Sequence, residues 1–134
     1  MTVEISSALR DRLCVAAKAT PDIEVCGLVF GTSERVEDIA FCANVAPEPR
    51  RTFEIDPVAL FAALRAERNG GPAVIGYWHS HPSGDVRPSA TDAARAAADG
   101  KIWLIVAGDI LGGWRALPGK GGATAFDAVT LNVV

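Results

Sequence analysis

Both histidines of the chain lie in one tetrapeptide, His79-Ser80-His81-Pro82, at the end of an apolar segment that begins at Ala73. The segment is typical of a buried strand, and Pro82 predicts that the strand ends there because proline cannot donate to a sheet ladder. Side chains two residues apart in an extended chain point to the same face, so both imidazoles can reach one metal ion. The sequence therefore predicts a half-open site at the end of a buried strand.

Helical and extended patterns alternate along the rest of the chain. Ser6 or Ser7 can cap a first helix, and Asp56-Pro57 predicts a second helix, with an N-cap carboxylate followed by proline at the first helical position. This mixture predicts an α/β fold, a single domain over residues 1–134 with a mixed central β-sheet flanked by helices. The predicted helices span residues 7–20, 57–68 and about 90–99, and the predicted strands span residues 25–31, 36–45, 53–55, 73–79, 101–107, 111–117 and 125–133.

Composition excludes several classes of protein. With 49% apolar and 22% charged residues, the 134-residue chain can bury a core, which excludes disordered and fibrous proteins. A net charge of −3 without any block of like charges makes nucleic acid an unlikely partner. Cys14, Cys26 and Cys42 show neither disulfide-framework nor zinc-cage spacing. No membrane span or signal segment is evident, so we expect a cytoplasmic protein.

A third metal ligand is needed beside the two histidines, and two carboxylates are candidates. Asp92 lies eleven positions after His81, early in the predicted third helix. Two histidines, one carboxylate and a water molecule form a catalytic zinc arrangement, whereas structural zinc sites use four protein ligands. Asp85 is nearer in sequence, but its Ser-Gly-Asp turn is a setting where acidic residues often form local hydrogen bonds.

The spacing of these residues fits a known motif. From His81, seven residues lead to Ser89 and two more lead to Asp92, which gives His-x-His-x7-Ser-x2-Asp when His79 is included. The chain thereby resembles the JAMM (JAB1/MPN/Mov34) metalloproteases, and residues 24–28, Glu-Val-Cys-Gly-Leu, resemble a segment of their small bacterial members. The resemblance extends from about residue 3 to residue 117. It implies a minimal JAB/MPN domain of cytidine-deaminase-like fold, and the tail from residue 118 lies outside it.

The resemblance also implies roles for five residues. His79, His81 and Asp92 would bind Zn²⁺, Glu24 would act as the general base, and Ser89 would help to bind the oxyanion. The chemistry agrees, because zinc lowers the pKa of a water molecule and polarises a carbonyl group. A carboxylate that is not a ligand can then move the proton to the leaving amine, and a neutral donor can stabilise the oxyanion.

Several of these residues and their neighbours could have a purely structural role instead of a functional one. Ser89 begins a Ser-x-x-Asp pattern that is typical of a helix cap, and Glu24 could be an ordinary solvated loop residue. Cys26 could approach the site or be a small core residue. Tyr77 and Trp78 alternate along the predicted strand, and we expect at least one of them to pack in the core.

The function implied by the resemblance is a zinc-dependent peptidase or isopeptidase that hydrolyses an amide bond after the C-terminal glycines of a ubiquitin-like or sulfur-carrier protein. The short chain favours a small bacterial-type carrier as substrate. The His-Pro-Ser-Gly-Asp loop is similar to that of RadC-like proteins linked with DNA repair, but their helix-hairpin-helix region is absent. A non-catalytic MPN scaffold is the third possibility, although scaffolds typically lose the metal ligands. A zinc deaminase is disfavoured because its Pro-Cys-x-x-Cys motif is missing.

Overall fold

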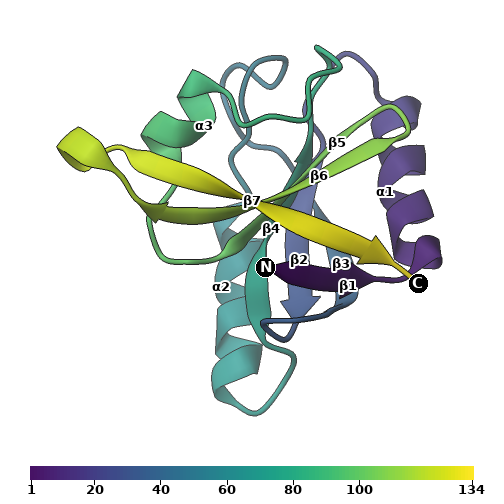
Figure 1. Cartoon of the computed structure of the whole chain (residues 1–134), viewed down its shortest axis with the longest axis vertical. Helices are drawn as coiled ribbons and strands as arrows, with labels where there is room; N and C mark the ends of the chain where they lie inside the picture. Colours follow the sequence, from purple (N-terminus) through teal and green to yellow (C-terminus); the bar gives the residue numbers. More distant parts are fainter.

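A seven-stranded mixed sheet organises the chain, and a computed structural model describes all of residues 1–134 (Figure 1). Two longer helices and one short helix accompany the sheet, which confirms the predicted α/β class. The elements are β1 (Thr2–Ile5), α1 (Ser7–Ala19), β2 (Cys26–Gly31), β3 (Val36–Cys42), α2 (Pro57–Arg68), β4 (Val74–Ser80), α3 (Ala90–Arg95), β5 (Ile102–Ala107), β6 (Ile110–Pro118), the 3-10 turn η1 (Lys120–Gly122) and β7 (Thr124–Val133).

The strands lie in the order β1-β7-β6-β5-β4-β2-β3. The β1–β7 and β4–β5 pairs are parallel, and the other neighbours are antiparallel. The sheet curls, so that its edge strand β1 meets the start of the other edge strand, β3. There the Glu4 amide donates to the Glu34 carbonyl at 2.8 Å, and Glu4 forms a bridge with Arg35. Strand β4 is central in this sheet, between β2 and β5.

Helix α1 packs on one face of the sheet and closes the main core. Its N-cap is Ser6, whose side chain accepts a hydrogen bond from the Leu9 amide at 3.1 Å. Leu9 and Leu13 are buried against the strands. Trp78 on β4 is also part of this core, and its indole N–H donates to the Ala40 carbonyl at 2.9 Å.

Helix α2 covers the face of β4 opposite to α1. Trp78 packs in the hydrophobic core beneath α1, whereas its neighbour Tyr77 packs in a second hydrophobic cluster that includes side chains of α2. Asp56 caps it by accepting from the Val58 amide at 3.1 Å, and Pro57 is its first residue, as the sequence predicts. No side chain of α2 is fully buried, so this helix leaves the sheet face beside it partly open. None of the helices has the length and apolar character that a membrane crossing requires.

Tertiary contacts alter two of the predicted elements, and the predicted strand at residues 36–45 ends earlier, at Cys42. The predicted strand at residues 53–55 is wrong, since only Ile55 forms a single bridge there, with Asn44. The predicted helix at residues 90–99 ends at Arg95. Ala96 is extended, with φ −67° and ψ 139°, and its carbonyl accepts a hydrogen bond from Thr124 Oγ1 at 2.7 Å.

Strand β1 is absent from the sequence prediction. Its four residues pair in parallel with the last residues of the chain, Thr2 with Thr130 through Ile5 with Val133. Such a short segment carries little periodicity of its own, and its partner lies at the far end of the sequence. The tail beyond residue 118 is therefore a structural part of the sheet.

Candidate metal centre

The two histidines converge as the sequence predicts. His79 is on β4 and His81 directly follows that strand, before Pro82. Both side chains are buried, and their Nε2 atoms lie 2.9 Å apart. The end of a central strand therefore holds two imidazole nitrogens at one point.

Asp92 completes this cluster from the first turn of α3. Its Oδ2 atom lies 3.3 Å from His79 Nε2 and 3.1 Å from His81 Nε2. A capping box fixes the carboxylate, because Ser89 Oγ accepts from the Asp92 amide at 3.0 Å and Asp92 Oδ2 accepts from the Ser89 amide at 2.9 Å. The capping interpretation of Ser89 is thus confirmed, and the cap aims Asp92 at the histidines.

Glu24 is also part of the cluster, so the interpretation of this residue as a solvated loop residue is wrong. Its side chain is buried just before β2, with Oε1 3.9 Å from His79 Nε2. That oxygen has no hydrogen-bond partner. One ligand atom from each of Glu24, His79, His81 and Asp92 lies within 4.8 Å of the others.

The two carboxylates have opposite pKa shifts. Burial raises the pKa of Glu24 to about 7. Burial also acts to raise the pKa of Asp92, but hydrogen bonds to His79 and His81 outweigh it, and the pKa of Asp92 is lowered. Pairs of acids whose pKa values diverge in this way are typical of sites that assign them different chemical roles. Asp92 stays ionised, whereas Glu24 can take up and release a proton near neutral pH.

Asp85 acts through its backbone and not through its carboxylate. Its carbonyl oxygen lies 2.6 Å from His81 Nδ1, so neutral His81 carries its proton on Nδ1 and a lone pair on Nε2. The Asp85 carboxylate is exposed and pairs with Arg87 at 2.9 Å. The alternative of Asp85 as a metal ligand is therefore wrong. A backbone contact of this kind leaves no trace in the sequence.

The donor set fits a divalent metal ion of the zinc type. With Nδ1 of His81 already donating, its Nε2 atom and Asp92 Oδ2 are both acceptors, yet they lie 3.1 Å apart in a buried place. Two acceptors at this distance need a cation or a shared proton between them. Imidazole nitrogen and carboxylate oxygen are the ligands of catalytic zinc, which uses three protein ligands and one open position.

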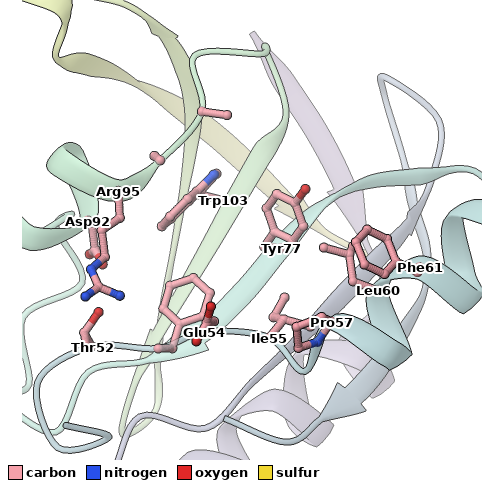
Figure 2. Close-up of a pocket in the computed structure, with 13 residues that line it drawn as sticks. Thr52, Glu54, Ile55, Pro57, Leu60, Phe61, Tyr77, Asp92, Arg95 and Trp103 are labelled. Atoms are coloured by element: carbon pink, nitrogen blue, oxygen red, sulfur yellow. The ribbon is translucent and has the colours of Figure 1, made fainter. Parts of the chain in front are cut away.

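A groove leads to this cluster along the α2 side of the sheet (Figure 2). Its volume is about 390 Å³, and most of its lining residues are apolar. Asp92 and Arg95 lie at one end and Leu60 and Phe61 at the other, with Trp103 and Tyr77 between them. The other lining residues are Thr52, Phe53, Glu54, Ile55, Pro57, Ala96 and Ala97.

Cys26 is a core residue, although its strand partner is His79. Its side chain is buried, and this burial raises the pKa of the thiol to about 12. The thiol donates to the Cys42 carbonyl at 3.6 Å. A thiol that stays protonated at neutral pH is neither a nucleophile nor a metal ligand.

The fold and the cluster define a metallohydrolase centre, in which two histidines and an aspartate meet beside a buried glutamate at the end of a groove. The family described as prokaryotic homologs of the JAB domain matches residues 6–118, and the chain belongs to this family. The protein is a metallopeptidase of the JAMM type.

Known relatives agree with this assignment. The chain is 41% identical over 95 residues to a desampylase of Haloferax volcanii, over 69% of this chain and 68% of the relative. It is 39% identical over 70 residues to a probable TtuB-protein conjugate cleaving protease of Thermus thermophilus, over 52% and 47% of the two chains. A JAB1/MPN domain protein of Archaeoglobus fulgidus has the same fold, with a TM-score of 0.57 and 20% identity over 99% of this chain and 98% of that one.

Proposed function

We propose that the protein is a zinc-dependent peptidase or isopeptidase that hydrolyses the amide bond after the C-terminal glycines of a ubiquitin-like or sulfur-carrier protein. The observation that carries this proposal is the buried Glu24, His79, His81 and Asp92 cluster at the end of an apolar groove. The relatives, a desampylase and a probable TtuB-protein conjugate cleaving protease, support a protein conjugate as substrate.

His79, His81 and Asp92 would hold the zinc ion in this proposal. When bound, zinc would lower the pKa of water and polarise the scissile carbonyl. Glu24 would take the proton of the attacking water and deliver it to the leaving amine. Ser89 Oγ already accepts a hydrogen bond from the Asp92 amide, so its hydroxyl proton is free to bind a developing oxyanion.

The burial of the cluster supports glycine as the residue before the scissile bond. His79 is fully buried and Asp92 is 3% exposed, so a peptide bond reaches them only in a segment with little side-chain bulk. Two glycines meet this condition. At the far end of the groove, α2 exposes Phe61, where the folded body of a carrier protein would lie.

A panel of carrier-protein conjugates tests the proposal. Each substrate joins a small carrier ending in Gly-Gly to a lysine side chain or to a short C-terminal extension. We expect cleavage directly after the second glycine, loss of cleavage with a zinc chelator, and recovery when Zn²⁺ is added back. A matched carrier ending in Val-Val should remain intact. Cleavage that survives chelation, or that occurs equally after valine, would contradict the proposal.

The role of Ser89 beyond capping is tested by two substitutions. Ser89→Ala should lower kcat by about 10²-fold with little change in KM if the hydroxyl stabilises the oxyanion. It should also cost about 1 kcal/mol of unfolding free energy through the lost cap. Ser89→Asp keeps a capping side chain, so it should be as stable as the parent, yet at least as inactive as the alanine variant because it adds negative charge.

Ser6→Ala is the matched control for this pair, because Ser6 caps α1 in the same way. It should lose similar stability in thermal unfolding and keep its kcat. An active and stable Ser89→Asp enzyme would reduce Ser89 to a helix cap.

A further inference from the structure

The two histidines of the cluster are held differently. His81 donates from Nδ1 to the Asp85 carbonyl, whereas His79 Nδ1 is buried and has no hydrogen-bond partner. Metal-binding histidines are almost always oriented by a hydrogen bond from their second ring nitrogen. Something else must therefore fix the His79 ring.

Two aromatic side chains enclose His79. Phe53 stacks on it, with ring centroids 4.2 Å apart and an interplanar angle of 23°. Trp103 meets it edge-on, at 5.5 Å and 89°. Phe53 and Trp103 also contact each other at 5.5 Å. Packing between rings thus restrains the imidazole where a hydrogen bond is missing.

Phe53 lies outside regular secondary structure, and the Asn44 side chain holds its segment. All four hydrogen-bonding positions of this carboxamide are used. Its amide group joins the carbonyl of Glu24 to the carbonyl of the residue before Phe53, while its oxygen binds the amide of the residue after Phe53. The bonds are Asn44 Nδ2 to Glu24 O at 2.8 Å and to Thr52 O at 3.0 Å, and Asn44 Oδ1 from the amides of Ala46 at 3.0 Å and Glu54 at 3.1 Å.

We propose that Asn44 and Phe53 are positioning residues of the metal centre: the Asn44 carboxamide fixes the Phe53 segment against the backbone of Glu24, and Phe53 fixes the ring of His79 by stacking. This inference rests on the proposed metal-binding role of His79. The Asn44 side chain thereby positions both the proposed base, Glu24, and the proposed ligand, His79.

Metal affinity tests the inference directly, without reference to turnover. We compare Phe53→Leu with Phe53→Tyr, which keeps the stacking ring, and with Phe61→Leu, which alters the same groove away from His79. Competition with a chromophoric chelator measures the Kd for Zn²⁺, and the visible spectrum of bound Co²⁺ reports ligand geometry. Phe53→Leu should raise Kd by about 10-fold to 100-fold and change the Co²⁺ spectrum, as expected when orienting contacts of a ligand are lost. The other two variants should match the parent.

Asn44→Asp tests the carboxamide at nearly constant size, because it replaces the two donors by acceptors that face carbonyl groups. We expect a similar rise in Kd, measured alongside the thermal unfolding of the metal-free protein. Asn44→Ser provides a milder change should the aspartate variant fail to fold. Parent-like affinity and spectrum in Phe53→Leu, or an equal loss in Phe61→Leu, would overturn the inference while leaving the proposed function intact. A parent protein that binds no Zn²⁺ at all would overturn the proposed function itself.

Discussion

Glu24→Gln should lower kcat for a carrier conjugate by about 10²-fold to 10⁴-fold, the usual contribution of a general base. The amide can hydrogen-bond to a water molecule but cannot take its proton. Metal content should stay at the parental level, because His79, His81 and Asp92 are unchanged. Steady-state kinetics and elemental analysis of the same preparations measure both quantities.

Glu37→Gln is a suitable control, since Glu37 is an exposed carboxylate on β3 that neither lines the groove nor belongs to the metal cluster. It should leave kcat close to that of the parent. Near-normal turnover of Glu24→Gln would contradict the assignment of the base. Loss of metal from this variant would instead make Glu24 a ligand and would require another proton acceptor.

The second large effect concerns the ligands, because His79→Ala and Asp92→Ala should each reduce zinc from about one ion per chain to a small residual fraction and abolish measurable cleavage. Two remaining ligands are too few for a stable catalytic zinc site. Elemental analysis after dialysis against metal-free buffer gives the occupancy. Asp92→Ala should also lose unfolding free energy, since it removes the acceptor of the Ser89 amide.

Asp85→Ala is the matched control for the ligand variants. Only the backbone carbonyl of Asp85 contacts His81, and alanine retains that carbonyl. This variant should therefore keep its zinc and its cleavage activity. Full zinc retention in both His79→Ala and Asp92→Ala would show that the ligands are misassigned.

The parts of the site that local sequence rules govern could be predicted. The convergence of His79 and His81 follows from the period of a strand, and the start of α2 follows from Asp56-Pro57. Ser89 and Asp92 carry their relationship in their spacing, which is that of a capping box. Such features depend on a few consecutive residues, so the sequence displays them.

Features that depend on distant contacts could not be predicted. Asn44 lies twenty residues from Glu24, and the hydrogen bond between them joins the segments that flank the paired strands β2 and β3. The end of α3 depends on Thr124, which bonds to Ala96 from 28 residues further along the chain. The burial of Glu24 likewise depends on a distant contact. The amide of Val25, the next residue, donates to Ser80 Oγ at 2.9 Å and holds the loop against β4.

The candidate ligands lie on elements of unequal rigidity. His79 belongs to β4, which is bonded to strands on both sides, whereas Asp92 is the only buried residue of the six-residue helix α3. Short elements with few buried contacts deform at low free-energy cost. Arg95 and the residues after it form a wall of the groove, so this wall yields before the β4 floor does. We therefore expect widening of the groove around an incoming chain to shift Asp92, so that substrate entry changes the ligand geometry.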